Sequence, residues 1–376
     1  MNDTLQELMR VATRLTQSGR LDEATAVIQR ALNGSARPRP SDGNAMSADR
    51  APQDPTIIDL DAGDVREVVV DEMAPVEARV EATVKTARAT ADVVGSDRFI
   101  SGALTAASRT GRYKLYVPPN HAGRSLPLVV LLHGCTQDPD DFAAGTGMNE
   151  RAREQGFYVL YPAQSQEANA SRCWNWFKHN HQRRNAGEPA LIAEMTRAVI
   201  AQFDIDQQRV FIAGLSAGGA MAAVVADAYP DLFAAVGIHS GLPRGAANNL
   251  QQALTAMKSP KAALAKSESR VPTIAFHGDE DRTVHPANGE QAIAVIVDHD
   301  AKPKVEQGKA PGGRRYTRSI HFDPAGRAMA ELWMIHGAGH AWSGGRAAGS
   351  YTDASGPDAT GEMLRFFFEH PRVITP

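Results

Sequence analysis

The stretch "RVFIAGLSAGGAMAAVVADAYP", residues 209–230, places one serine between an apolar run and a segment rich in alanine and valine. The run has the length of a buried strand, and the segment after the serine favours a helix. Ser216 forms a Gly-x-Ser-x-Gly pattern with Gly214 and Gly218. A serine on a sharp strand-to-helix turn needs small neighbours, because the turn must close tightly. The stretch therefore predicts a nucleophilic serine rather than merely a tight turn.

Further apolar runs, each with the length of a strand, accompany this stretch. They are residues 126–134, 157–163, 234–241, 272–281 and 330–340, while residues 111–118 alternate as an edge strand would. Helical segments such as 188–203 lie between them. Strands that alternate with helices predict an α/β domain with a mostly parallel sheet. In such a sheet the loops after the strands meet in one crevice, which is where we expect the chemistry.

A nucleophilic serine needs a histidine base and an acid that orients it. Two of the predicted strands end in suitable residues. After residues 272–278 come Asp279 and Asp281, of which Asp281 is the favoured acid and Asp279 the competitor. The last strand leads to His336 and then, in a glycine-rich loop, to His340, the favoured base. The chain order serine, aspartate, histidine is that of the α/β-hydrolase fold.

Acyl transfer also requires backbone N–H groups that stabilise the negative oxygen of the intermediate. One donor is expected from Ala217, directly after the serine. The second is expected from the loop after residues 126–132, where "HGC" supplies Cys135, with Gly134 as the alternative. If "HGC" is only a turn that ends a strand, the second donor must come from elsewhere.

Composition excludes several classes of function. The 376 residues carry 40 basic and 43 acidic side chains, a net charge of −3, which argues against nucleic acid as a partner. No apolar run is long enough to span a membrane, and no leader segment is apparent, so a cytoplasmic location is expected. Cys135 and Cys173 are the two cysteines, too few for a four-ligand zinc site, and no metal is expected.

Three regions differ in their sequence pattern. Residues 1–34 carry apolar residues at helical spacing on both sides of a break, which predicts a helical hairpin. Residues 35–96 begin with the Pro-, Ser- and Asp-rich "SARPRPSDGNAMSADRAPQDP" and are expected to form a largely disordered linker. Residues 97–376 hold all the predicted strands and form the expected catalytic domain.

Five separated blocks of the chain resemble the esterase family of polyhydroxybutyrate depolymerases, of the short-chain-length type. They are "LLHGCTQDPDDFAAGTGMNERAREQGFYVLYPAQ", "CWNWF", "RVFIAGLSAGGAMA", "FHGDEDRTVHP" and "GHAWSGG" with the closing "SYTDASGPDATGEMLRFFFEHP". The resemblance implies an α/β-hydrolase that cleaves poly(3-hydroxybutyrate) or its oligomers without a cofactor. Feruloyl and acetylxylan esterases are similar to this family, so a carbohydrate-linked ester is the alternative substrate.

The resemblance also assigns roles to single positions. It makes Ser216 the nucleophile, Asp281 the acid, His340 the base and Cys135 an oxyanion donor, and it brings Trp174, Asn175 and Trp342 close to the substrate, with Trp176 less favoured. It places Cys135 near Cys173, and a disulfide between them is a hypothesis that a reducing compartment would oppose.

Two functional alternatives concern the rest of the chain. Two interpretations of the hairpin of residues 1–34 are open: it attaches the enzyme to a granule surface or to a second copy of itself, or it is a loosely packed N-terminal appendage. A non-catalytic binding protein on a hydrolase fold is the alternative of another class, and its signature would be the loss of Ser216, Asp281 or His340, all of which are present.

Overall fold

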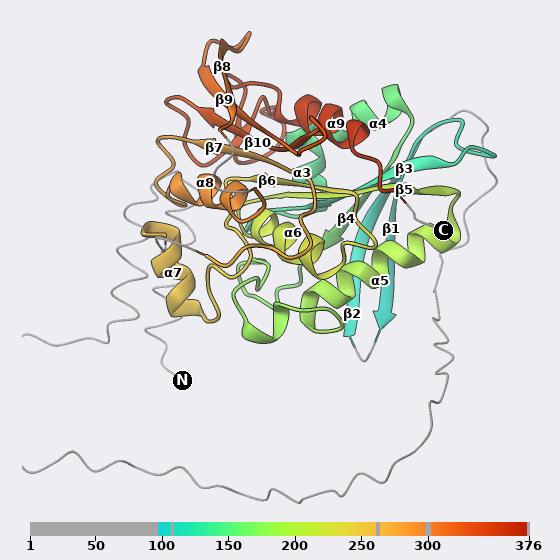
Figure 1. The fold of residues 1–376 in the computed structure, drawn as a ribbon. Helices are drawn as coiled ribbons and strands as arrows, with labels where there is room; N and C mark the ends of the chain where they lie inside the picture. Colours follow the sequence, from blue (N-terminus) through green and yellow to red (C-terminus); the bar gives the residue numbers. More distant parts are fainter. Residues whose placement is uncertain (1–96, 107–108, 261–263, 298–301, 374–376) are drawn as a thin grey trace, which may run out of the picture. The chain divides into compact units, whose positions relative to one another are not determined.

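The structure is a computed structural model, and it describes residues 97–106, 109–260, 264–297 and 302–373 (Figure 1). The predicted hairpin of residues 1–34 and the predicted linker of residues 35–96 both lie outside the described residues.

A ten-stranded sheet, the largest in the described residues, forms the centre of the domain. Its strand order is β1-β2-β4-β3-β5-β6-β7-β10-β9-β8. The strands are β1 (Arg98–Ala106), β2 (Arg109–Val117), β3 (Leu126–Leu132), β4 (Tyr158–Ala163), β5 (Ile205–Leu215), β6 (Ala235–His239), β7 (Thr273–Gly278), β8 (Lys304–Lys309), β9 (Arg315–Phe322) and β10 (Ala328–Ile335). Strands β4 to β10 in this order are parallel, and the outer pairs at both ends are antiparallel.

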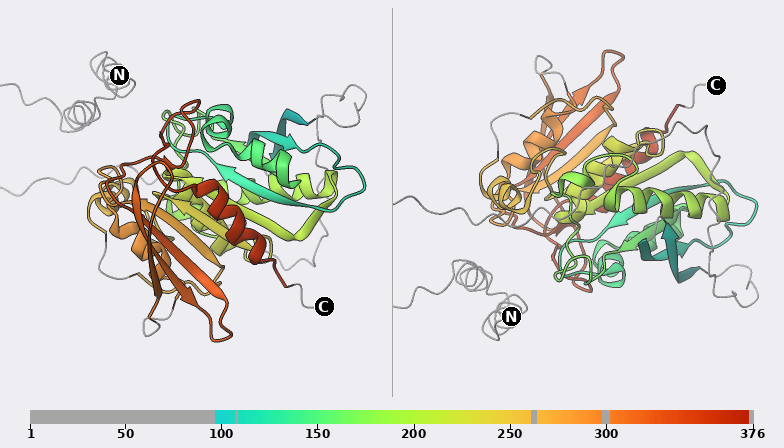
Figure 2. Two further views of the ribbon diagram at one scale, coloured as in Figure 1. Left: turned by 90° about the horizontal axis from the view of Figure 1, so that it is seen from above. Right: turned by 90° about the horizontal axis from the view of Figure 1, so that it is seen from below.

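Helices cover both faces of this sheet. They are α3 (Pro139–Thr146), α4 (Met148–Gln155), α5 (Gly187–Gln202), α6 (Ala217–Ala228), α7 (Leu250–Lys258), α8 (Ala287–Ala294) and α9 (Ala359–Glu369), with a short 3₁₀ helix η1 (His179–His181). Figure 2 shows α9 across one face and α5 and α6 across the other. A small two-stranded sheet pairs β11 (Trp342–Ser343) with β12 (Thr352–Asp353).

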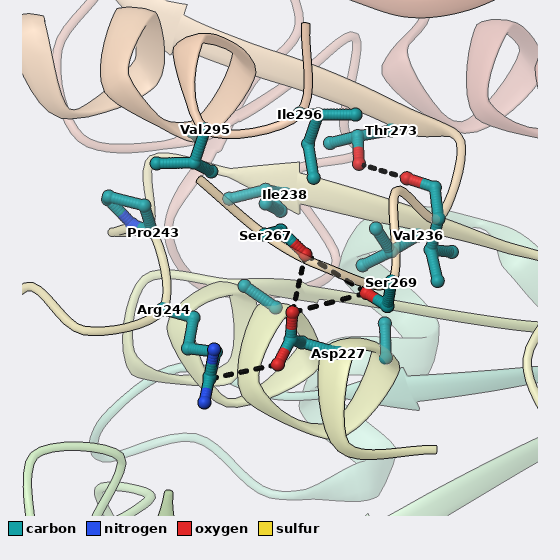
Figure 3. A pocket seen from close by; sticks show the side chains of 14 residues that line it. Asp227, Val236, Ile238, Pro243, Arg244, Ser267, Ser269, Thr273, Val295 and Ile296 are labelled. Atoms are coloured by element: carbon teal, nitrogen blue, oxygen red, sulfur yellow. Dashed lines mark hydrogen bonds and ion pairs between the residues drawn. The ribbon is translucent and has the colours of Figure 1, made fainter. Parts of the chain in front are cut away.

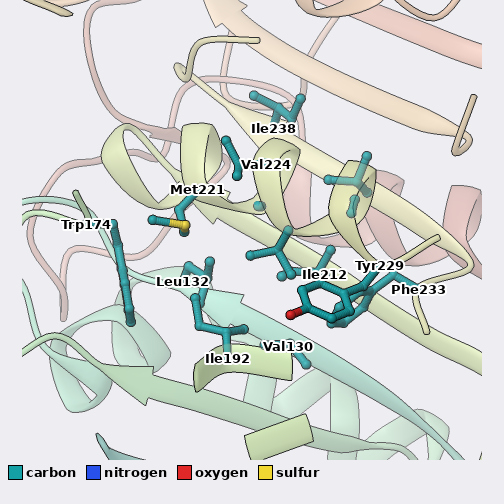
Figure 4. Close-up of a cluster of buried hydrophobic side chains, with 14 of the residues drawn as sticks. Val130, Leu132, Trp174, Ile192, Ile212, Met221, Val224, Tyr229, Phe233 and Ile238 are labelled. Carbon is teal, nitrogen blue, oxygen red and sulfur yellow. The ribbon is translucent and has the colours of Figure 1, made fainter. Parts of the chain in front are cut away.

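Two apolar clusters fill the space between the sheet and these helices. The cluster of Figure 4 packs Val130 and Ile212 of the central strands against Met221 and Val224 of α6. The other cluster packs Phe211 against Phe367 of α9, among further aromatic residues. All seven residues of β3 are buried, as expected for a parallel strand covered on both faces. The predicted α/β class is therefore confirmed.

The structure differs from the sequence analysis at both ends of the sheet. Residues 111–117 of the predicted edge strand 111–118 fall in β2, which is not an edge strand, because β1 pairs with it along its whole length. The hairpin of β8 and β9 extends the other end of the sheet and was not anticipated. Its strands contain no apolar run, since β8 reads "KVEQGK" and is mostly exposed.

Candidate active site

Ser216 stands at the turn between β5 and α6. Its backbone angles, φ 57° and ψ −119°, are a conformation that a residue with a side chain rarely adopts. The turn can close only because glycines flank it. A Cβ atom on Gly218 would lie 2.1 Å from the carbonyl oxygen of Leu132, and one on Gly214 would lie 2.4 Å from the backbone of Gly218. The strained turn presents Ser216, which is only partly buried, at the start of α6.

The start of α6 favours an anion beside Ser216. Ala217 is the first residue of the helix, so its N–H has no partner within the helix, and the helix dipole adds partial positive charge there. The "HGC" loop lies next to this turn, because a Cβ on Gly134 would be 3.6 Å from the carbonyl oxygen of Leu215. This arrangement suits the stabilisation of an oxyanion.

Within the "HGC" loop, the two candidate donors differ in availability. The N–H of Gly134 donates to Oε1 of Gln137 at 2.9 Å, so the alternative donor is already engaged. Among the described residues, no group accepts a hydrogen bond from the N–H of Cys135. The geometry therefore favours Cys135 over Gly134 as the second donor.

A disulfide joins Cys135 to Cys173 and ties the "HGC" loop to the segment before α5. The same two segments are also hydrogen-bonded, because the N–H of Thr136 donates to the carbonyl oxygen of Ser171 at 2.7 Å. Thr136 has a positive φ of 67°, so this loop holds a second uncommon backbone conformation. The disulfide and the hydrogen bond both fix the position of the Cys135 N–H.

The favoured acid and the favoured base contact each other. Nδ1 of His340 is 2.7 Å from Oδ2 of Asp281, whose side chain is completely buried. The other carboxylate oxygen accepts the N–H groups of Thr283 and Val284, both at 2.9 Å. Burial opposes ionisation of Asp281, but hydrogen bonds from His277 and His340 outweigh it and hold its pKa well below the usual range. Asp281 is therefore an anion that orients the imidazole.

A further histidine, His277, also contacts the acid and was missed by sequence reasoning. Its Nε2 lies 3.4 Å from Oδ2 of Asp281 and 2.8 Å from the carbonyl oxygen of Val284. The side chain is buried at the end of β7. Its position in "FHGDED", four residues before the acid, was the available signal.

The two competitor residues pair with each other. Nδ1 of His336 is 2.8 Å from Oδ2 of Asp279, and the N–H of Gly337 donates to Oδ1 of Asp279 at 2.7 Å. Nε2 of His336 is 2.9 Å from the hydroxyl of Thr317 on β9. This second pair lies at the surface, with side-chain exposures of 38% and 37%.

The nucleophile and the base loop meet through one residue, His239. Its carbonyl oxygen accepts the N–H of Ser216 at 2.8 Å, and its ring accepts the N–H of Ser343 at 2.9 Å, three residues after His340. In the described residues Ser216 Oγ and His340 are not hydrogen-bonded to each other. Such bonds are often loose before a substrate binds. The side chains needed for a serine nucleophile thus gather at the carboxyl ends of β5, β7 and β10.

Residues 111–302 match the family model described as Esterase PHB depolymerase. The chain belongs to this esterase family. Over 238 residues it is 33% identical to poly(3-hydroxyalkanoate) depolymerase C of Paucimonas lemoignei, covering 59% of this chain and 56% of that protein. Over 132 residues it is 35% identical to a probable acetylxylan esterase A of Aspergillus fumigatus, covering 35% of this chain and 34% of that protein.

Among solved structures, the acetyl xylan esterase from Aspergillus awamori is similar, with a TM-score of 0.56 at 20% identity. The alignment covers 73% of this chain and 100% of that one. At this identity the likeness shows the α/β-hydrolase fold alone. The chain spans about half or less of the length of the curated relatives above.

Three residues expected to contact substrate have core positions in this family member. Trp342 is 1% exposed; it stacks on His239 and donates its indole N–H to Thr360 at 3.0 Å. Asn175 is also buried and donates from Nδ2 to Glu188 at 2.6 Å. Trp342 is thus packed in the core and Asn175 is hydrogen-bonded to Glu188, and their substrate roles stay predictions.

Trp174 differs from these two residues in one respect. It is 2% exposed, so it presents no open aromatic face, and its substrate role stays a prediction. Its indole N–H, however, has no hydrogen-bond partner among the described residues. The ring lies against His133 and within the apolar cluster that includes Ala217 and Cys135. Trp174 therefore packs against residues of the "HGC" loop, in the apolar cluster.

The cavity of Figure 3 is separate from these residues. It lies between α6 and the segment around α8 and has a volume of about 30 Å³, room for about one water molecule. Asp227 at its edge pairs with Arg244 at 2.9 Å and accepts hydrogen bonds from Ser267 and Ser269. The cavity contains none of the candidate catalytic residues, and it is too small for an ester substrate.

The described residues hold neither a cluster of metal ligands nor a helix that spans a membrane. No group of three or more His, Cys, Asp or Glu side chains there could hold a metal ion. None of the helices there is both long enough and apolar enough to cross a bilayer.

Proposed function

We propose that the chain is a serine esterase that hydrolyses ester bonds of poly(3-hydroxybutyrate), or of related short-chain polyhydroxyalkanoates and their oligomers. One observation carries the proposal. A buried aspartate, Asp281, is hydrogen-bonded to His340 at 2.7 Å, in a loop that is held beside the strained turn of Ser216. This arrangement supports general-base activation of a serine hydroxyl.

The proposed mechanism uses two half-reactions. Ser216 Oγ attacks the ester carbonyl, and His340 takes its proton through Nε2, the ring nitrogen that does not face Asp281. The N–H groups of Ala217 and Cys135 stabilise the oxyanion. His340 then gives the proton to the leaving alcohol, and an acyl group remains on Ser216. In the second half-reaction His340 deprotonates a water molecule that releases the acid.

The choice of a polyester substrate has weaker support than the chemistry. The depolymerase of Paucimonas lemoignei aligns over 238 residues, whereas the acetylxylan esterase of Aspergillus fumigatus aligns over 132. The longer alignment favours a polyester. An acetylxylan-type ester is the second candidate, supported by the acetylxylan esterase of Aspergillus fumigatus and by the shared fold. A feruloyl-type ester belongs to the same candidate through the family resemblance. A non-catalytic role is disfavoured, because Ser216, Asp281 and His340 are all present and the last two are hydrogen-bonded.

Two comparisons test the proposal with the full chain. The first measures p-nitrophenyl butyrate hydrolysis by the wild type and by Ser216→Ala, where we expect a loss of about 10⁴-fold or more. Equal rates would remove the serine mechanism. The second offers amorphous poly(3-hydroxybutyrate) granules, soluble hydroxybutyrate oligomers, acetylated xylan and feruloylated sugars side by side. Faster release from the xylan or the feruloylated sugars would replace the polyester with the second candidate.

A further inference from the structure

His239 occupies the strand between the nucleophile and the acid. It is the last residue of β6, and its register partners are Leu215 of β5 on one side and Phe276 of β7 on the other. Its side chain is completely buried. Because Ser216 directly follows Leu215, His239 is next to the nucleophile turn without belonging to the expected catalytic set.

This residue contacts both the turn of Ser216 and the loop of His340. Its backbone carbonyl oxygen accepts the N–H of Ser216 at 2.8 Å. Its side-chain Nε2 accepts the N–H of Ser343 at 2.9 Å, and Ser343 lies in the loop that carries His340. The ring is stacked on Trp342 of the same loop, with 5.0 Å between ring centroids. One residue therefore joins the turn of the nucleophile to the loop of the base.

The hydrogen bonds define the protonation state of the ring. A backbone N–H can only donate, so Nε2 of His239 must carry a lone pair and no proton. In a neutral imidazole the proton then sits on Nδ1, which is 3.1 Å from the hydroxyl of Ser240 and can donate to it. Burial, together with the charges that His277 and His340 carry when protonated, lowers the pKa of His239 to about 3. The ring is thus neutral at the pH at which an esterase works.

A neutral hydrogen-bond acceptor is needed at this position for two reasons. Ser343 is 1% exposed, so its N–H cannot turn to water if the acceptor is removed. A cationic side chain could not accept this hydrogen bond, and it would add positive charge near His340, which must itself become positive during turnover. A histidine held in one neutral tautomer meets both requirements.

We propose that His239 is a positioning residue that holds the loop of His340 over the turn of Ser216. The proposal rests on the proposed serine-esterase function, since it concerns how that site is aligned. His239 does not touch the reacting atoms. It acts through the Ser216 N–H and the Ser343 N–H, and a shift of the base by about 1 Å can cost on the order of 100-fold in rate.

Two substitutions separate the acceptor from the shape of the ring. His239→Phe keeps a ring that can stack on Trp342 but removes the acceptor, while His239→Gln places an amide oxygen at similar reach. We expect His239→Phe to lower kcat by roughly 10- to 100-fold, with KM changed by less than about twofold. His239→Gln should restore kcat to within about threefold of the wild type. If His239→Phe turns over like the wild type, or if both variants lose activity equally, the proposal is wrong.

A second readout does not depend on substrate binding. A fluorophosphonate probe reacts with an activated serine, and its labelling rate at Ser216 reports how well His340 is placed. We expect labelling to slow by about the same factor as kcat in His239→Phe and to recover in His239→Gln. Unchanged labelling of a folded His239→Phe protein would overturn the proposal.

The wild-type chain provides a test that remains valid if a variant fails to fold. Nitrogen-15 NMR should show His239 with its proton on Nδ1 and an unprotonated Nε2 between pH 5 and pH 8, and the amide of Ser343 should exchange slowly. A proton on Nε2 of His239 would contradict the proposed positioning role, because Nε2 could then not accept the N–H of Ser343. If the wild type hydrolyses no ester, the proposed esterase function is wrong. The two NMR observations would still test whether His239 accepts the N–H of Ser343.

Discussion

Among the described residues, two aspartate–histidine pairs join Nδ1 of the histidine to the carboxylate at nearly equal distances, and only one of them lies at the candidate site. Asp281 and His340 are 2.7 Å apart, and Asp279 and His336 are 2.8 Å apart. In each pair Nδ1 of the histidine faces one carboxylate oxygen. The other oxygen accepts two backbone N–H groups in Asp281 and one in Asp279. Hydrogen-bond distance alone therefore does not distinguish a catalytic pair.

The two pairs differ in burial and in what the second ring nitrogen can reach. The Asp281 side chain is completely buried, while that of Asp279 is 37% exposed. His336 faces the hydroxyl of Thr317, which lies within a regular strand, whereas the loop of His340 is joined through His239 to the strained turn at the start of a helix. The comparison teaches that a histidine base alone does not activate a hydroxyl. The hydroxyl must also lie on a turn that exposes it beside the start of a helix, as Ser216 does and Thr317 does not.

The largest expected effect separates the two histidines. His340→Gln should lower kcat/KM for p-nitrophenyl butyrate by about 10⁴- to 10⁶-fold, because the base is lost. The matched variant His336→Gln should keep kcat/KM within about twofold of the wild type, since the hydroxyl that His336 faces, that of Thr317, lies within a regular strand. A strong loss in His336→Gln would reverse the assignment of the two pairs.

The next effect separates the two acids. Asp281→Asn should lower kcat by about 10³- to 10⁴-fold, because an amide cannot stabilise the imidazolium and favours the wrong tautomer of His340. Asp279→Asn, measured in the same assay, should retain nearly full activity. Similar losses in both variants would show that the exposed pair also supports catalysis.

A smaller effect is expected for the second histidine beside the buried acid. His277→Gln should lower kcat by about 10-fold and leave KM almost unchanged, because His277 lies 3.4 Å from Asp281 and does not reach the nucleophile turn. Steady-state kinetics on a soluble ester would measure both constants. An unchanged kcat in a folded variant would show that His277 has no part in positioning Asp281.

The smallest effect concerns stability and its dependence on pH. The pKa of Asp281 is lower in the folded chain than its usual value near 3.9, so the ionised carboxylate stabilises the fold above that pH. This contribution is lost as the pH falls through the folded pKa. The free energy of unfolding of Asp281→Asn should therefore lie about 1–3 kcal/mol below that of the wild type at pH 6, and the gap should narrow below pH 4.

Urea denaturation at pH 6 and pH 3 measures this gap, and Asp279→Asn is the control. The exposed pair should contribute less than about 1 kcal/mol at either pH. A gap for Asp281→Asn that widens on acidification would contradict the sign of the argument.

The sequence predicts the parts of the fold that depend on local pattern. Strand β3 is a continuous apolar run because both of its faces are buried, and the turn of Ser216 needs glycine because backbone atoms lie within 3 Å of the missing side chains. Both features are visible in a single stretch of residues. The hairpin of β8 and β9 has no comparable signal, because its exposed strands need few apolar residues.

The site was less predictable where long-range contacts decide it. The sequence places acids and histidines after the correct strands, but it does not show that Asp279 pairs with His336. It also gives no sign that His239 accepts the N–H of a residue 104 positions away. Trp342 has the aromatic character of a substrate contact, yet its place between His239 and Phe142 makes it part of the core.

The most direct test of the central claim is covalent labelling by a fluorophosphonate, followed by peptide mass spectrometry. The account predicts one label per chain, located on Ser216, with a wild-type rate in Asp279→Asn and a rate lower by at least about 100-fold in Asp281→Asn. A label on another residue, such as Thr317, or equal labelling rates in the two variants, would contradict the assignment of Ser216, His340 and Asp281 as the active site.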